Sequence, residues 1–199
     1  MQPYKYVLIS ALFVSSSLCS AAWQIDEQQS VVNFSSTKTL TTGHAVTENH
    51  EISSVVGQVD DQGHFNFKLD TRTVNTHIPL RDARLKQHLF HTAVHPWIQI
   101  TGQLTPINLS LLSQPSTTAL IEQPFKLDID GHVLQLIGHF NLKHTAGKTE
   151  LELNKPLVVS TNSLEMSAGM QKLTQMAGLA SIKTEVPVQI HLELSGNAI

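Results

Sequence analysis

Strict alternation of apolar and polar residues is the feature that most constrains the fold of this chain. Every second residue is apolar in HFNFKLD (64–70), and the same period of two recurs in FKLDID (125–130), TELELN (149–154) and VQIHLEL (188–194). Because successive side chains of a β-strand point to opposite faces, each segment predicts a strand with one apolar and one polar face. Such strands belong to antiparallel sheets that cover a core with one face.

Turn signals indicate how many strands the chain contains. DDQG (60–63), DG (130–131), AG (146–147) and NKP (154–156) separate the alternating segments. About eight strands of ordinary length fit into the chain at this spacing. Eight antiparallel strands build a sandwich or a closed barrel, and periodicity alone does not distinguish the two. The sequence thus predicts an all-β fold; a barrel would enclose room for one small ligand, whereas a sandwich core is packed.

The segment NTHIPLRDARLKQHLFHTAVHPW, residues 75–97, changes to the helical period. Pro79 suits the first turn of a helix because its missing N–H has no partner there. Ile78, Leu85 and Leu89 share one side of such a helix. We therefore expect the first of two short helices here.

Four polar residues at intervals of three or four form a stripe roughly opposite that apolar side: Arg81, Arg84, His88 and His91. In a first interpretation, His88, His91 and His95, which follows one turn later if the helix continues, bind a metal ion. In a second, Arg81 and Arg84 receive an anionic group through charge-assisted hydrogen bonds. In a third, the helix closes the barrel end, its charges pair locally and the histidines are solvated.

A second helix is predicted from about Ser167 to Ala177, with Gly178 as its C-terminal cap. One face of this helix carries four apolar residues: Met166, Met170, Leu173 and Ala177. Methionine on such a face usually fills gaps in a core; the alternative is an adaptable wall against a flexible apolar ligand.

The first 22 residues have the pattern of a signal peptide. Lys5 precedes the apolar run YVLISALFV, and small residues follow in SSSLCSAA. We expect cleavage after Ala22, or after Ala21, and a periplasmic mature domain of residues 23–199. The apolar run is shorter than the roughly 20 residues of a membrane span, so no stable membrane insertion is expected. The single cysteine, Cys19, lies in the leader, so the mature domain has no thiol or disulfide.

The charge balance limits the class of partner. Removal of residues 1–22 leaves 177 residues, the length of one domain, with 12 basic and 16 acidic residues and a net charge of −4. An acidic domain is a poor match for nucleic acid or an anionic membrane surface. We therefore expect no nucleic-acid partner.

Motifs of known catalytic chemistry do not occur in the sequence. The chain contains neither a G-x-S-x-G elbow nor an H-E-x-x-H metal motif nor a glycine-rich phosphate loop. DIDG (128–131) lacks the further ligands of a calcium loop. We expect a protein that is not an enzyme and that needs no cofactor.

Three segments, in order along the chain, resemble the YceI-like family of exported, lipocalin-like proteins. AWQIDEQQSVVNF (22–34) is similar to the opening segment of the family, and VNTHIPLRDARLKQHLF (74–90), followed by HPWIQITGQL (95–104), is similar to its central signature. LEMSAGMQKLTQMAGLASIKTEVPVQIHLEL (164–194) is similar to the closing segment of a subgroup. The resemblance covers nearly the whole mature chain.

This resemblance implies an eight-stranded antiparallel, lipocalin-like barrel with a long apolar pocket. Some family members hold a polyisoprenoid there, such as a quinone tail or a prenyl phosphate, and the family binds ligands rather than catalysing reactions. The Arg-Asp signature of the family falls on Arg81 and Asp82, with Leu85 and Phe90 at its hydrophobic positions. THIPLRD and LFH depart from the commoner form of the family, which indicates a subgroup whose pocket is closed differently.

The resulting hypothesis is a periplasmic carrier of an isoprenoid or other lipid, held in the barrel by apolar burial. Arg81 and Arg84 are the expected head-group contacts. The expected wall residues are apolar side chains of the strands and the first helix: Phe65, Phe67, Leu85, Phe90, Phe125, Leu127, Ile129 and Phe140.

Two other classes of function stay open. One is a metal-binding protein that uses His88, His91 and His95. The other is a barrel filled by its own side chains that acts as a protein-interaction or stress-related module. The assembly can be a monomer or a homodimer.

Overall fold

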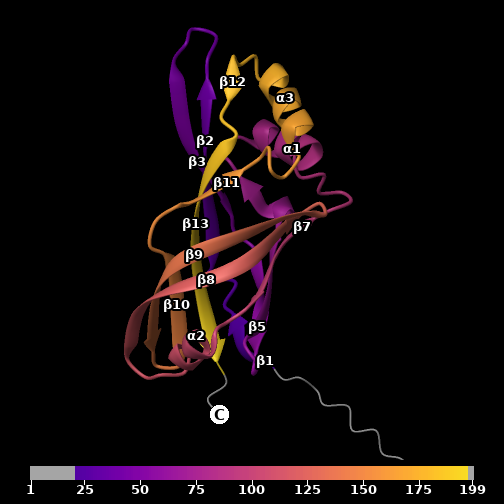
Figure 1. Ribbon diagram of the computed structural model, residues 1–199. Coiled ribbons are helices and arrows are strands. Elements are labelled where there is room, and N and C mark those ends of the chain that lie inside the picture. Colours follow the sequence, from indigo (N-terminus) through magenta and orange to yellow (C-terminus); the bar gives the residue numbers. More distant parts are fainter. Residues whose placement is uncertain (1–20, 197–199) are drawn as a thin grey trace, which may run out of the picture.

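The computed structural model describes residues 21–196, in which thirteen strand segments join one sheet (Figure 1). All pairs of neighbouring segments are antiparallel. The segments are β1 (Ala21–Ile25), β2 (Val31–Thr39), β3 (Ala45–Ile52), β4 (Val55–Asp60), β5 (His64–Asp70), β6 (Val74–Asn75), β7 (Trp97–Gln103), β8 (Thr117–Ile129), β9 (His132–Thr145), β10 (Lys148–Leu153), β11 (Leu157–Ser160), β12 (Ser181–Ile182) and β13 (Glu185–Gly196).

Eight of these segments close a ring. The order β1-β4-β5-β7-β8-β9-β10-β13 returns to its start, because β13 also pairs with β1 through Trp23 and Gly196. The other segments lengthen the wall on one side of this ring: β2 pairs with β13, β3 with β2, β6 with β3, β11 with β13 and β12 with β2. The predicted eight-stranded antiparallel barrel is confirmed.

Several of the eight strands are bent rather than straight. β1 and β2 follow each other along β13, while β4 and β3 pair with β1 and β2 in turn. β1 and β2 therefore form one long strand interrupted by a bend, and β3 and β4 form another. The bends divide the molecule into a closed ring, in the lower part of Figure 1, and an extension that carries the β2–β3 hairpin, in the upper part.

Burial follows the predicted alternation. On β5, Phe65, Phe67 and Leu69 are buried while His64 and Asn66 are exposed. The same alternation runs along β8 and β10. The apolar faces of the strands together form the core inside the barrel.

Both predicted helices are present, as α1 (Pro79–His88) and α3 (Ser167–Met176). They lie together at the end of the molecule that carries the β2–β3 hairpin (Figure 1). A third helix, α2 (Pro106–Leu111), was not predicted and lies at the other end. Its sequence signal is the pair Thr105–Pro106, because the Thr105 hydroxyl accepts a hydrogen bond from the Asn108 backbone N–H and Pro106 occupies the first turn. A short 3-10 turn, η1 (Thr71–Thr73), links β5 to β6.

Two details predicted for the first helix are wrong. Ile78 precedes α1 as its N-cap residue and is 46% exposed, so it does not join the apolar side of the helix. The helix also ends before His91, which has a left-handed backbone with φ of 48°. Because the chain leaves the helix there, His91 and His95 do not continue the stripe of Arg81 and His88.

The two helices approach each other closely at a glycine. A Cβ atom on Gly169 of α3 would lie 2.4 Å from the backbone oxygen of His88 at the end of α1. The guanidinium group of Arg84 donates a hydrogen bond of 3.2 Å to the backbone oxygen of Met176. The pair therefore covers the barrel end as one unit.

The predicted signal peptide, residues 1–22, lies outside the described residues except for Ala21 and Ala22, which begin β1. Among residues 21–196, no helix is long and apolar enough to cross a membrane.

Candidate functional site

A cavity of about 420 Å³ lies between the barrel interior and the helix pair α1–α3. Ligand pockets in proteins generally have about 300–1,000 Å³. The lining includes every second residue from Val32 in β2 to Leu40 just after it, eight residues apart, which corresponds to about 26 Å of extended chain. The cavity is therefore long and suits an extended ligand.

Most predicted site residues line this cavity. Five of them are apolar: Leu85, Phe90, Phe125, Leu127 and Ile129. The two predicted head-group residues, Arg81 and Arg84, line it as well. The arginines do not lie opposite the apolar side of α1, as the stripe implied, because Arg81 precedes Leu85 by one helical turn and shares its side of the helix.

The methionine face of α3 forms another part of the wall. The residues concerned are Met166, Met170, Leu173 and Ala177, all of which line the cavity. An unbranched methionine side chain adapts its shape to a flexible neighbour. The face therefore lines the cavity, while Met170 and Leu173 are at the same time buried among the core residues.

Three predicted wall residues lie elsewhere. Phe65, Phe67 and Phe140 border a much smaller cavity of about 50 Å³ in the closed ring. The rings of Phe65 and Phe67 stack with their centroids 5.2 Å apart. Phe65 and Phe140 also cover Gly102 and Gly138, where an added Cβ would come within 2.4 Å of the nearest ring. Aromatic side chains therefore fill this half of the barrel, while the other half is hollow.

The inward face of β2 and β3 becomes polar along the cavity. In order from the barrel centre toward the hairpin tip, its facing pairs are Val32 with Ile52, Phe34 with His50, and Ser36 with Glu48. Lys38 follows on β2 and also lines the cavity. The cavity therefore has an apolar inner end and a polar outer end.

An ion cluster connects this polar end to α1. Glu48 accepts hydrogen bonds of 2.7 Å from the ammonium group of Lys38 and from Nη1 of Arg81. Arg81 also donates through Nη2 to the backbone oxygen of Thr76, at 2.7 Å. The hydrogen bond from Lys38, followed by that from Arg81, holds the pKa of Glu48 below its usual value against the effect of burial. Glu48 is therefore ionised and balances one of the two cations.

The signature acid Asp82 has a different task from its neighbour Arg81. Its carboxylate accepts hydrogen bonds from the hydroxyl and the backbone N–H of Thr76, which is buried. These bonds fix the chain that enters α1, so Asp82 orients the helix rather than facing a ligand.

His50 is the most deeply buried ionisable group at the polar end, with 4% of its surface exposed. Its Nε2 lies 2.8 Å from the Ser36 hydroxyl, and its ring meets the Phe34 ring edge-on at 5.1 Å. Burial, followed by the nearby charge of Arg81, lowers the pKa of His50. The imidazole is therefore neutral at pH 7.

Sequence reasoning missed His50, Glu48 and Lys38. The signal for Glu48 and His50 is the segment AVTENHEI of β3, where they take inward positions instead of apolar residues. Polar residues on the inward face of a strand in an otherwise apolar barrel indicate a site. The segment carries no apolar alternation of its own, so it did not stand out as a strand.

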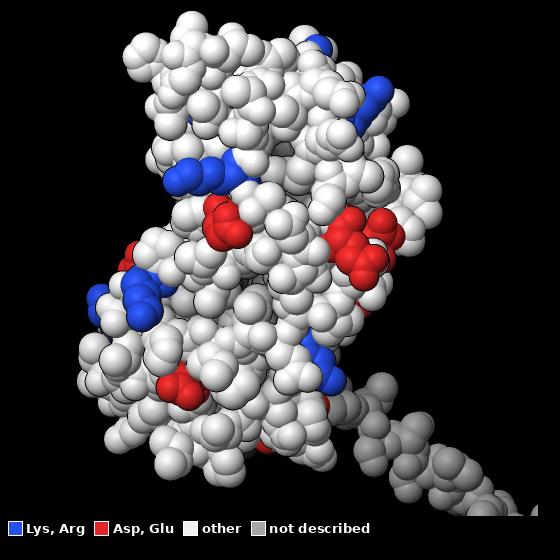
Figure 2. Space-filling model, turned by 45° about the horizontal axis from the view of Figure 1, so that its top comes forward, with Lys and Arg blue, Asp and Glu red and all other residues white. Residues whose placement is uncertain are grey.

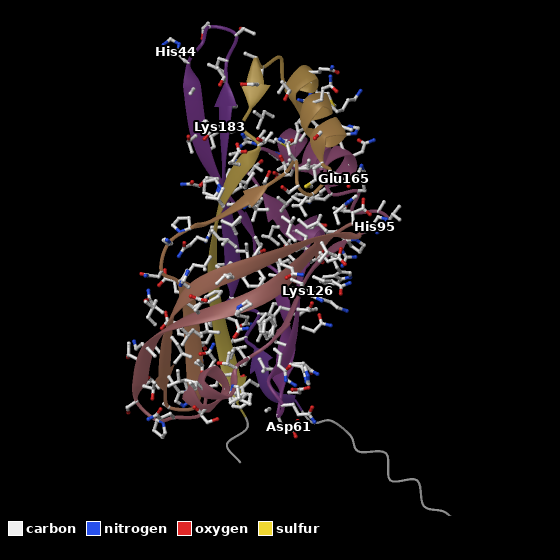
Figure 3. All side chains as sticks on the ribbon, viewed as in Figure 1. His44, Asp61, His95, Lys126, Glu165 and Lys183 are labelled. Carbon is white, nitrogen blue, oxygen red and sulfur yellow. The ribbon has the colours of Figure 1, made fainter. Side chains whose placement is uncertain are left out.

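Positive charge dominates the polar end. Among the described residues that line the cavity, Lys38, Arg81, Arg84 and Lys183 face a single acid, Glu48. Figure 3 places Lys183 beside β12, at the same end as the β2–β3 hairpin and α3. On the molecular face seen in Figure 2, by contrast, basic and acidic side chains lie in small separate groups.

The three candidate metal ligands do not form one metal site, although two of them lie near the same carboxylate. His91 and His95 lie 3.4 Å and 2.9 Å from the carboxylate of Asp130, in the turn between β8 and β9, and His88 remains on α1. Within residues 21–196, no group of three or more His, Cys, Asp or Glu side chains has the geometry to hold a metal ion.

Solved structures with the same fold were found by comparison of the coordinates. The chain is similar to a polyisoprenoid-binding domain from Saccharophagus degradans implicated in plant cell wall breakdown, with a TM-score of 0.81 and 23% identity over 89% of this chain and 100% of that one. Burkholderia cenocepacia BcnA gives a TM-score of 0.62 and 14% identity over 85% and 98%. The YCEI protein of Campylobacter jejuni gives 0.51 and 11% identity over 100% of both chains.

A comparison with curated protein sequences gave no match. The family model of the YceI-like domain matches residues 23–194, which is nearly the whole described chain. Together with the closed eight-stranded barrel, this match shows that the chain belongs to the YceI-like family.

Proposed function

We propose that this protein is a periplasmic carrier that binds one long-chain apolar ligand, an isoprenoid such as a quinone or a prenyl phosphate or another lipid. The ligand tail lies in the cavity against Leu85, Phe90 and the apolar face of β8. The head group lies at the polar end, near Arg81 and Arg84. The protein binds its ligand without chemical change.

The observation that carries this proposal is the long apolar cavity of about 420 Å³. Each buried methylene group contributes about 0.8 kcal/mol, so a tail of about ten such groups gains about 8 kcal/mol before the cost of association. Apolar walls of this kind need no catalytic residue to retain a tail. A packed barrel would instead fill the same volume with its own side chains, as the Phe65 half does.

The structural neighbour from Saccharophagus degradans supports the same class of ligand, because that protein is a polyisoprenoid-binding domain. The export of the chain is supported by the signal-peptide pattern of residues 1–22. The methionines of α3 add a wall that tolerates tails of different shape.

Native mass spectrometry of the full-length protein, purified from the periplasm of its host, tests the proposal. We expect a stoichiometric adduct that solvent extraction releases as a long-chain lipid. The extracted protein should regain mass when incubated with a polyprenyl quinone or a polyprenyl phosphate. A mass equal to that of the bare chain, both before and after these incubations, would refute the carrier function and favour a protein-interaction role.

A further inference from the structure

We propose that His50 and the Nε–H of Arg81 form a donor pair that binds an acceptor oxygen of the ligand head group, with His50 in the Nδ1–H tautomer. This proposal rests on the proposed carrier function and adds the residues that select the head group. It places the head group inside the wall formed by β2, β3 and α1, rather than outside the barrel.

The first argument is an unmatched pair of buried nitrogens. Among the described residues, two buried side-chain nitrogens have no hydrogen-bond partner in the protein: Nδ1 of His50 and Nε of Arg81. Both residues line the 420 Å³ cavity. A buried polar group without a partner costs about 1–3 kcal/mol, so the fold retains these two groups against a penalty that a bound oxygen would remove.

The second argument is the state of the Arg81 guanidinium group. Its Nη1 is held by Glu48 and its Nη2 by the backbone oxygen of Thr76, each at 2.7 Å. The two-pronged edge that binds a carboxylate or phosphate is therefore already divided between protein groups. Nε is the guanidinium nitrogen that has no partner in the protein, and it can only donate.

The third argument concerns the tautomer of His50. A neutral imidazole carries one proton, and its Nε2 faces the Ser36 hydroxyl at 2.8 Å. If Ser36 donates to Nε2, the proton is on Nδ1, and Nδ1 becomes a second donor without a partner in the protein, in addition to Nε of Arg81. A head group that presents acceptor oxygens satisfies both donors at once.

The position of His50 also suits the boundary between tail and head. His50 faces Phe34 on the neighbouring strand. This pair lies between the polar pair Ser36–Glu48, which is nearer the hairpin tip, and the apolar pair Val32–Ile52, which is nearer the barrel centre. A tail that lies against the apolar pairs therefore brings its first polar atom to the level of His50.

Two isosteric substitutions separate the ring nitrogens. The amide nitrogen of asparagine takes the place of Nδ1, so His50→Asn keeps the proposed donor and loses the hydrogen bond with the Ser36 hydroxyl. The amide nitrogen of glutamine takes the place of Nε2, so His50→Gln keeps a hydrogen bond with the Ser36 hydroxyl and loses the proposed donor at Nδ1. The probes are polyprenyl chains of one length that end in a plain hydrocarbon, a benzoquinone or a phosphate.

For the wild-type protein, we expect both oxygen-bearing probes to bind more tightly than the hydrocarbon. His50→Gln should weaken both oxygen-bearing probes about tenfold and leave the hydrocarbon unchanged, whereas His50→Asn should preserve the preference. A loss for the benzoquinone alone would identify a carbonyl as the head group, and a loss for the phosphate alone would identify a phosphate. Equal losses for all three probes, or a preference that survives in His50→Gln, would overturn the proposal.

A measurement on the unmodified protein guards against variants that fold poorly. The 15N chemical shifts of His50 distinguish its tautomers, and we expect Nδ1 to be protonated and to shift when an oxygen-bearing probe is added but not with the hydrocarbon. A protonated Nε2 would refute the donor pair while leaving the carrier function intact. If no probe binds the wild-type protein, the carrier function itself fails.

Discussion

At the scale of single residues, the polar end of the cavity depends on how three side chains share their hydrogen bonds. Glu48 neutralises one cation and occupies one arm of Arg81. His50 is buried and neutral beside it. The remaining positive charge at this end favours a head group with negative or partly negative oxygens.

Replacement of Arg81 by alanine tests the head-group end. We expect Arg81→Ala to weaken a polyprenyl phosphate by about 10- to 100-fold, because a hydrogen bond to a charged group contributes about 1.5–3 kcal/mol. A polyprenyl hydrocarbon of the same length should lose less than about threefold. The two affinities can be measured by titration in native mass spectrometry.

Arg72→Ala is the matched control for that variant. It removes the same charge from an exposed arginine that pairs with Asp70 and does not line the cavity. Its affinities should equal those of the wild type. Equal losses for phosphate and hydrocarbon in Arg81→Ala would contradict a head-group role for Arg81.

The buried His50 should make stability dependent on pH. Burial lowers its pKa in the folded protein from the ordinary value of 6.5, so the unfolded chain binds the proton more readily. Stability is then full above pH 6.5 and falls as the pH drops through 6.5 toward the lower pKa of the folded state. We expect the free energy of unfolding, measured with urea, to decrease between pH 7 and about 5.5.

His50→Asn should reduce this decrease, because an amide does not titrate. Glu48 shifts stability with the same sign, but its loss begins only as the pH falls below 4.5, so the two groups act in separate windows. A curve for His50→Asn that matches the wild type between pH 7 and 5.5 would show that His50 is not the group responsible.

At the scale of elements, the helix pair α1–α3 closes the hollow half of the barrel. Neither helix derives its place from propensity alone: α1 is anchored by Asp82 and Thr76, and α3 rests on α1 at Gly169. The sequence pattern identifies both helices, but it says nothing about this contact.

Gly169→Ala tests the contact between the helices. Alanine favours a helix over glycine by about 1 kcal/mol, but the new Cβ would lie 2.4 Å from the backbone oxygen of His88, which cannot rotate away. We expect a net loss of about 1–3 kcal/mol of stability in chemical denaturation. Gln171→Ala, an exposed change in the same helix, should stay within about 0.5 kcal/mol. A Gly169→Ala protein as stable as that control would show that the helices separate readily.

At the scale of the whole molecule, one barrel has a filled half and a hollow half. The rings of Phe65, Phe67 and Phe140 occupy the closed ring, whereas β2, β3, α1 and α3 surround open volume. Stability and ligand affinity should therefore respond to different residues.

A pair of substitutions separates the two halves. Phe65→Ala should cost about 3–5 kcal/mol of stability and leave tail affinity nearly unchanged, because it opens space in the filled half. Met170→Trp should place extra volume in the cavity and lower tail affinity at least tenfold while the protein stays folded. Thermal unfolding and a binding titration report the two effects. If Phe65→Ala abolishes binding at unchanged stability, the division into halves is wrong.

The sequence by itself determined the all-β fold, the two longer helices and part of the apolar cavity wall, namely five of its residues. Alternation is a local property, since each inward side chain follows from the parity of its position in a strand. Phe125, Leu127 and Ile129 could therefore be predicted as wall residues before any contact was known. The resemblance of three segments to one family supplied the closure into a barrel.

Only the tertiary structure decided which inward residues face open volume and which face each other. Phe65 and Leu127 have the same pattern in their strands, yet Phe65 lies in the filled half and Leu127 borders the large cavity. The polar end was equally hidden, because Glu48 and Arg81 are 33 positions apart in the sequence and meet only where β3 packs against α1. Burial and hydrogen bonding depend on such distant neighbours, so no local pattern predicts them.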